Sequence, residues 1–279
     1  MAGAGGGAAR ELRRPGREGA PVARPMSRPR REYPGLPAVV LRVSEAIKVD
    51  IWSDVQCPWC YIGKRKFEDG AAQFGGDVEV EYHSFELSPD TPVDFDGNTV
   101  DYLSQRKGMP VAQVEEMLER VTGIAKSVGL DYDFEHVHQT NTVIAHELLH
   151  FAKSKGRQLD MKERLLKAYF VEGHHVGRIA DLADLAAEIG LDRAEAVAAL
   201  EAHSYLADVK ADVAQAQAYG IQGVPFFVID GKYGVSGAQE AVAFANVLEQ
   251  ARTERDAAQS DSAEMDSADT DAESEQVAP

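Results

Sequence analysis

Cysteine is scarce in this chain: its 279 residues include two, Cys57 and Cys60. A small secreted fold held together by disulfides needs more cysteines, at wider spacings. The sequence also lacks any apolar run near the roughly 20 residues that span a bilayer. The best apolar run near the N-terminus, residues 37–41, is shorter than the core of a secretory signal, about 7 to 15 residues. We therefore expect a cytoplasmic protein with no membrane partner, whose cysteine pair serves chemistry or metal binding.

Basic residues are also in deficit, with 29 Lys and Arg against 46 Asp and Glu and a formal net charge of −17. The folded part is therefore not expected to bind nucleic acid. Neither end of the sequence shows a periodic apolar face, so we expect residues 1–46 to be a disordered extension and residues 253–279 a disordered acidic tail. The Arg-rich extension fits a transit peptide, a basic arm, a dispensable addition or a start codon placed ahead of Met26.

Two alternating apolar stretches flank a helical one after the N-terminal extension. The alternation predicts strands over residues 47–51 and 78–82. Between them the spacing predicts a helix over residues 57–74, with Pro58 in its first turn, where a missing N–H costs nothing. A strand, a helix and a second strand in this order are typical of a parallel crossover.

The far end of the chain predicts the rest of the sheet. Residues 225–229 have the pattern of a buried strand, Asp230-Gly231 is a hairpin signal, and residues 233–236 form the return strand. A last helix is predicted to end near residue 250.

The stretch from about residue 99 to residue 219 has helical periodicity without a strand pattern. The order of elements indicates an α/β protein: a thioredoxin-like fold with an inserted all-helical domain. We predict the thioredoxin-like domain over residues 47–90 and 204–252, and the helical insertion domain over residues 91–203.

The two cysteines stand in the run Cys57-Pro58-Trp59-Cys60, a Cys-x-x-Cys pair beside a β-α-β pattern. Free N–H groups and the helix dipole at a helix start favour a thiolate, which is the nucleophile of disulfide exchange. We therefore predict that Cys57 attacks, with a pKa lowered by the helix end, and that Cys60 resolves. Half of a structural zinc site is the alternative, but no second cysteine pair exists to complete it.

A second motif, Gly223-Val224-Pro225, stands at the beginning of the strand predicted over residues 225–229. A proline entering a core strand is out of place unless its peptide bond is special, and a cis bond is the usual explanation. A trans proline that starts the strand is the alternative. We predict a cis Val224–Pro225 bond beside the sulfurs, with Pro58, Trp59, Val224 and Pro225 forming the substrate-binding surface.

Further stretches accompany these two motifs. They are Asp50–Val55 before the cysteines, Tyr61–Lys64 after them, Asn141-Thr142, Ala145-His146, Ala168–Phe170, Glu172-Gly173, Phe226-Phe227 and Val235–Gln239. Together with the cysteine and proline motifs they make the sequence, over about residues 47–250, resemble the DsbA family, and within it the FrnE-like branch.

The resemblance implies a thioredoxin fold with an inserted helical domain, and dithiol–disulfide exchange at Cys57, Cys60 and Pro225 without a cofactor. Some FrnE-like proteins carry a second cysteine pair, which this chain lacks, so a relay through one is excluded. The expected partners are protein or small-molecule thiols and disulfides, with glutathione as one candidate, and a homodimer is among the assemblies left open. The alternative function is a glutathione-dependent isomerase resembling the 2-hydroxychromene-2-carboxylate isomerases. Those share the fold and carry a serine in place of the attacking cysteine.

One motif points to different chemistry. His146, Glu147 and His150 fit H-E-x-x-H, in which two histidines bind zinc and the glutamate activates water in a peptidase. A third ligand is not evident from spacing, and histidines in a helix core or on its surface explain the motif more simply. No metal site is therefore expected, and a zinc peptidase and a binding module with a vestigial cysteine pair remain the other classes.

Overall fold

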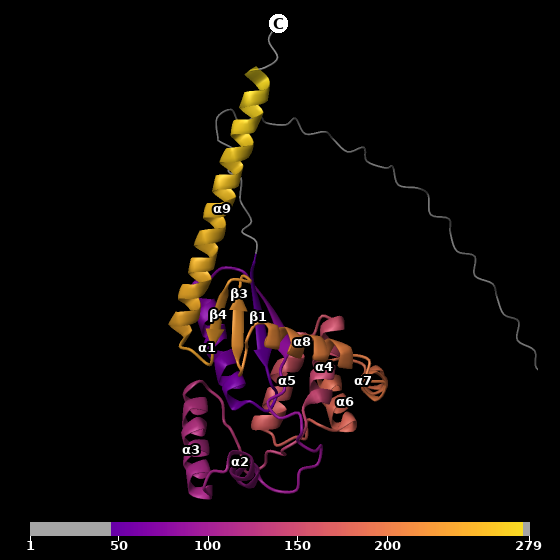
Figure 1. Ribbon diagram of the computed structural model, residues 1–279. Helices are drawn as coiled ribbons and strands as arrows, with labels where there is room; N and C mark the ends of the chain where they lie inside the picture. The colour runs from indigo at the N-terminus through magenta and orange to yellow at the C-terminus, as the bar shows by residue number, and fades with distance from the viewer. Residues whose placement is uncertain (1–45, 276–279) are drawn as a thin grey trace, which may run out of the picture. The chain divides into compact units, whose positions relative to one another are not determined.

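The computed structural model describes residues 46–275, with side chains as far as residue 260. The disorder predicted for residues 1–45 and 276–279 lies outside the described residues. Within the described part, four strands form a sheet in the order β2-β1-β3-β4 (Figure 1). They are β1 (Ile47–Ser53), β2 (Val78–Ser84), β3 (Phe226–Ile229) and β4 (Tyr233–Ser236).

Strand pairing follows from the connections between the strands. β1 and β2 are joined through the first helix and pair in parallel, with Ile51 opposite Tyr82. β3 and β4 are joined by a tight turn in which Asp230 has a φ of 54°, and they pair antiparallel. β3 also pairs antiparallel with β1. The parallel unit and the hairpin predicted from the sequence are both confirmed.

Helices account for most of the remaining described residues, and none of those described is both long and apolar enough to cross a membrane. Their bounds are α1 (Pro58–Phe74), α2 (Thr99–Lys107), α3 (Val111–Ser127), α4 (Val143–Ser154), α5 (Gln158–Phe170), α6 (Ile179–Glu188), α7 (Arg193–Glu201), α8 (Leu206–Ala218) and α9 (Ala241–Glu275).

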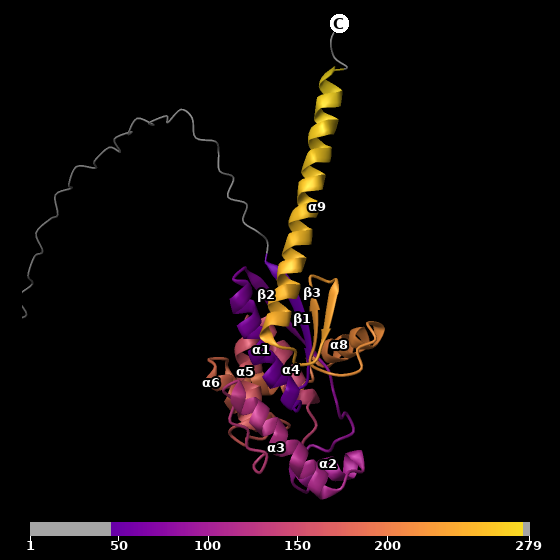
Figure 2. The same cartoon turned by 90° about the vertical axis from the view of Figure 1, so that its left-hand side faces the viewer.

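The two faces of the sheet are covered by different helices (Figures 1 and 2). Ile51 of β1 packs in one cluster with Phe67 of α1 and Phe244 of α9. Trp52, the next residue along the strand, points to the opposite face and packs with Ala216 of α8. Successive side chains of a strand alternate between faces, so one strand anchors both helical layers.

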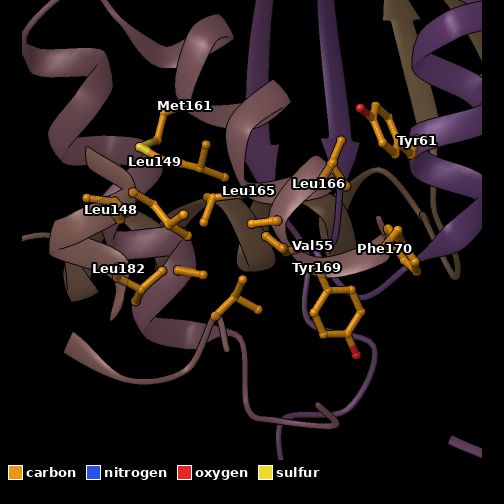
Figure 3. Packing of buried hydrophobic residues seen from close by; sticks show 14 of the residues in the cluster. Val55, Tyr61, Leu148, Leu149, Met161, Leu165, Leu166, Tyr169, Phe170 and Leu182 are labelled. Atoms are coloured by element: carbon orange, nitrogen blue, oxygen red, sulfur yellow. The ribbon is translucent and has the colours of Figure 1, made fainter. Parts of the chain in front are cut away.

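Helices α2 to α8 confirm the predicted helical block, and with the sheet they confirm the thioredoxin-like fold with a helical insertion. One core joins this block to the start of α1 (Figure 3). In it Leu148 of α4 and Leu165 of α5 share a cluster with Val55 and Tyr61, which flank the cysteine pair in sequence. Burial of this apolar surface stabilises the block against the site. The domain boundaries at residues 91 and 203 stay predictions.

The C-terminal helix overturns one prediction. A helix end near residue 250 and a disordered tail from residue 253 were expected, but α9 continues to Glu275. Ala251 is buried against the sheet cluster, and the Arg255 guanidinium pairs with Asp230 and donates to the Ala46 carbonyl at 3.1 Å. These contacts fix the helix past residue 250.

The docking of α9 predicts that its middle turn contributes to stability. A chain ending at Gln250 lacks Ala251 and Arg255 and should melt roughly 3 to 8 °C lower than the full chain. A matched chain ending at residue 260 keeps both residues and should melt like the full chain. Differential scanning calorimetry measures both, and equal melting of the two truncated chains would contradict the docking.

A buried network at the β2 edge ties the sheet to α8. The His83 ring stacks on Trp52 at a centroid distance of 4.5 Å and bonds Asp50 at 2.8 Å and Asp212 of α8 at 2.9 Å. Burial lowers the pKa of His83, but the bonds to these two carboxylates outweigh it and raise the pKa to about 9. The protonated ring therefore holds the two elements together.

This network predicts a pH-dependent stability. The folded pKa of about 9 lies above the ordinary 6.5, so the contribution is complete below pH 6.5 and is lost as the pH rises through 9. The free energy of unfolding should fall by up to about 3 kcal/mol across that window. Denaturant titrations at several pH values measure this. A His83→Gln variant should show a flatter profile, and a variant as steep as the wild type would contradict the assignment.

Candidate active site

The cysteine pair occupies the start of α1. Cys57 is the N-cap residue and Pro58 the first helical residue, directly after the turn that leaves β1. The Cys60 N–H donates to the Cys57 carbonyl at 3.0 Å, so the two side chains lie on one side of the first turn. Both are free thiols, and each is 3% exposed. The two thiols are close enough for each to shift the pKa of the other.

The second predicted motif meets the first. The Val224–Pro225 bond is cis, as the sequence predicted. The Cys57 thiol donates to the Val224 carbonyl at 3.4 Å, although 167 positions separate the two residues. The Gly237 N–H donates to the Pro225 carbonyl at 2.8 Å and anchors the proline to the end of β4. Two segments far apart in sequence thus meet at the Cys57 sulfur, and the end of β4 holds one of them in place.

The titration of the reduced pair differs from the prediction. The hydrogen bond to the Cys60 sulfur and burial raise the pKa of Cys57 well above its usual range. Burial also opposes ionisation of Cys60, but the bond from the Cys57 thiol and the positive charge of Lys162 lower the pKa of Cys60. The predicted low pKa of Cys57 is therefore wrong, because the neighbouring Cys60 sulfur and burial outweigh the helix end.

An apolar pocket opens beside Cys57. It has a volume of about 440 Å³, and Cys57, Pro58, Trp59 and Val224 form one wall, while Cys60 is not among its lining residues. Trp59 is 38% exposed there. The facing wall comes from the helical block and its loops: Tyr102, Leu103, Met117, Leu118, Val121, Phe134 and Tyr169, with Arg106 and Lys107 as the cations. Such a volume lies within the range of small-molecule sites.

The chain is similar in sequence and fold to known proteins. A family model for the DSBA-like thioredoxin domain matches residues 48–249. The chain belongs to the DsbA-like thioredoxin domain family. It is 32% identical over 190 residues to the Bacillus subtilis (strain 168) protein YwbO, covering 66% of this chain and 86% of that protein.

Solved structures agree with the family. A probable DsbA oxidoreductase from Streptomyces coelicolor is 38% identical, with a TM-score of 0.69 over 74% of this chain and 89% of that one. A 2-hydroxychromene-2-carboxylate isomerase is 14% identical, with a TM-score of 0.55 over 77% of this chain and 98% of that one, and shows the shared fold alone. This DsbA-like chain is therefore an enzyme of the class of thiol–disulfide oxidoreductases and isomerases.

A buried carboxylate whose role is not evident from the sequence holds the site of this DsbA-like enzyme together. Asp54 is fully buried and accepts hydrogen bonds from the Leu87 N–H at 2.8 Å, Thr142 Oγ1 at 2.9 Å and His146 Nε2 at 3.3 Å. Burial raises the pKa of Asp54, but these bonds, that of His146 first, outweigh it and lower the pKa. Asp54 thus fixes the turn before Cys57 to α4 and to the chain after β2. The sequence offered one indication of this role, namely the position of Asp54 between β1 and the cysteine pair.

The H-E-x-x-H side chains point to separate partners. His146 bonds Asp54, and His150 bonds Asp212 at 3.0 Å. Glu147, fully buried, accepts from His203 Nδ1 at 2.8 Å. The two histidines are therefore each committed to a different carboxylate.

A possible ligand group that the sequence did not indicate lies elsewhere among the described residues. Asp50, Glu81 and His83 bring their ligand atoms within 4.8 Å of one another. The Lys48 ammonium already lies 3.1 Å from Asp50 and 3.8 Å from Glu81. A lysine thus supplies the positive charge that this group attracts.

A glycine of α1 permits the contact with the cis-proline. A Cβ placed on Gly63 would lie 2.9 Å from Pro225 Cγ and 3.5 Å from Ala238 Cβ. Real Cβ atoms essentially never approach that closely, so the helix or the proline would have to move. Gly63 belonged to the family-like stretch, but its role becomes visible only in the packed structure.

This contact predicts the effect of one added methyl group. Gly63→Ala should push Pro225 away from the sulfurs and slow disulfide exchange at least about tenfold, since misplacement by about 1 Å costs on the order of 100-fold in rate. Gly123→Ala on α3 is the matched control, because no atom lies within 4 Å of its added Cβ. An insulin-reduction assay compares them, and equal activity of the two variants would contradict the role of Gly63.

Proposed function

We propose that this enzyme catalyses dithiol–disulfide exchange, with Cys57 as the attacking thiol and Cys60 as the resolving thiol. The observation that carries the proposal is the placement of Cys57 at the pocket wall, with Cys60 behind it within hydrogen-bond reach. A substrate in the pocket can reach Cys57 but not Cys60, because only Cys57 lines the pocket. The Cys60 sulfur can take the Cys57 proton as the attack proceeds. A low pKa on the outer cysteine is then not required.

The proposed substrate surface consists of Pro58, Trp59, Val224 and Pro225. The first three line the pocket, and Pro225 lies behind Val224 with its ring against Gly63. An extended segment of a substrate can pair with the Val224 backbone as an added strand and bring its sulfur to Cys57. Apolar side chains next to the substrate disulfide would then enter the aromatic pocket.

The proposed partners are protein or small-molecule thiols and disulfides, and glutathione is a candidate because a pocket of about 440 Å³ can hold a peptide of that size. We place the exchange in the cytoplasm, because the only two cysteines form the proposed reactive pair and structural disulfides are rare in cytosolic proteins. Within the family, the stretches around the cysteines and Pro225 favour the FrnE-like branch.

The isomerase alternative makes a different demand on the same sulfur. An enzyme that takes glutathione as a cofactor and carries a serine at the attacking position needs no Cys57 thiol. Turnover of 2-hydroxychromene-2-carboxylate by a Cys57→Ser variant, with added glutathione, would therefore support the isomerase and not the exchange enzyme.

The exchange mechanism predicts opposite behaviour of the two cysteine variants. Cys57→Ser should abolish insulin reduction by dithiothreitol, because the attacking sulfur is lost. Cys60→Ser should instead accumulate mixed disulfides at Cys57, because the resolving thiol is missing. Non-reducing electrophoresis with peptide mapping detects them. Mixed disulfides at Cys60 in the Cys57→Ser variant, with none at Cys57 in the other, would reverse the roles.

A further inference from the structure

The pocket beside Cys57 carries positive charge in a protein that is strongly negative overall. The chain has a formal net charge of −17, yet Arg106 and Lys107 line this pocket and no described aspartate or glutamate does. Both cations lie in the last turn of α2, on the facing wall that the helical block provides. A pocket with charges of one sign and apolar walls of low dielectric attracts ligands of the opposite sign. The lining of the pocket therefore fits an anionic occupant.

The two cations differ in how far other residues already compensate their charge. The Arg106 guanidinium pairs with Asp90, with Nη1 3.2 Å from Oδ2, and lies 5.8 Å from the centroid of the Tyr102 ring. Asp90 accepts from two of its nitrogens, which leaves further N–H donors of the five that a guanidinium has. Lys107 is exposed and has no hydrogen bond or ion pair with any described residue. The Lys107 ammonium is therefore the cation best placed to meet an anion from outside the chain.

The strand pairing proposed for the substrate decides where its anion must stand. Successive side chains of an extended segment point to opposite faces. When the substrate backbone pairs with Val224 and its cysteine points at Cys57, the residues directly before and after that cysteine point to the facing wall. This wall offers the apolar side chains of Met117 and Leu118 as well as the Lys107 ammonium. An acidic residue on one side of the substrate cysteine and an apolar residue on the other would both find a matching surface.

We propose that the enzyme selects polypeptide disulfides in which an acidic residue is the direct neighbour of the cysteine that Cys57 attacks, and that Lys107 recognises its carboxylate. Arg106, held by Asp90, adds to the positive charge of the same wall. This substrate class deepens the proposed function and rests on it. The recognition of the acidic residue by Lys107 can nevertheless be measured by binding alone, without an exchange step.

Matched peptides test the selection. Each carries glutamate, glutamine or lysine directly before or directly after a cysteine that is joined to 2-thiopyridine by a disulfide. Cys57 attacks the peptide sulfur: the S–S bond breaks, a disulfide between Cys57 and the peptide forms, and pyridine-2-thione leaves with the Cys57 proton. At low salt, kcat/KM for the glutamate peptide should exceed that for the glutamine peptide about three- to fivefold in at least one position, and the advantage should shrink at high salt. Equal kcat/KM for the two peptides in both positions would overturn the selection.

Variants of Lys107 assign the recognition to one side chain. Lys107→Met should bring the ratio of kcat/KM for the glutamate and glutamine peptides to about one, and Lys107→Glu should favour the lysine peptide instead. Lys126→Met is the matched control, because Lys126 is the exposed basic residue in the last turn of α3 and does not line the pocket. Both substitutions remove a cation from a helix end, so their effects on the helix dipole are alike. A wild-type ratio in Lys107→Met, or an equal loss in Lys126→Met, would contradict the proposal.

A binding measurement separates this inference from the proposed function. Peptides with serine in place of the cysteine cannot exchange, and the exposed Trp59 of the pocket reports their binding by fluorescence. The glutamate form should bind the wild type about three- to fivefold more tightly than the glutamine form, and Lys107→Met should remove the difference. If the wild type releases thione no faster than Cys57→Ser, the proposed function fails, and these titrations still decide the recognition. Equal binding of the two forms, together with normal thione release, would overturn the inference and leave the proposed function intact.

Discussion

The hydrogen bond from the Cys57 thiol to the Val224 carbonyl joins the two ends of the sheet-forming chain at the site. It requires that β3 insert beside β1 in the observed register, with Phe227 opposite Ile51. It also requires that α1 approach the proline closely, which the missing side chain of Gly63 allows. The helical block can be inserted between these halves because the contact depends on the sheet and α1, not on the length of the connection.

Buried charge is the second constraint on the site. The Asp54 carboxylate fixes the turn before Cys57 through its hydrogen bonds, and the Lys162 ammonium lies 5.3 Å from the centroid of the Tyr82 ring. Both are fully buried, and the partners of each come from elements other than its own. Asp54 bonds the start of α4, and Lys162 is itself part of α5. The helical block therefore supplies polar partners that hold the turn before Cys57, in addition to a pocket wall.

The regular elements could be predicted from the sequence because they depend on local patterns. Alternation at Ile47 to Ile51, the cysteine spacing and the proline before a core strand each point to one local structure, and the structure confirms them. The roles of Asp54 and Gly63 depend on residues that the fold brings from far along the chain. The Cys57 pKa was mispredicted for a related reason, since the neighbouring Cys60 sulfur and burial in the packed structure outweigh the helix end. The extent of α9 was missed because the bond from Arg255 to Asp230 has no local signature.

The central claim is that access, and not the lower pKa, decides which cysteine meets the substrate. Timed alkylation of the reduced wild-type enzyme at neutral pH, with peptide mapping of each sulfur, tests this most directly. Cys57 lines the pocket and Cys60 does not, so Cys57 should be labelled first even though the pKa of Cys60 is the lower one. Labelling of Cys60 ahead of Cys57 would contradict the account.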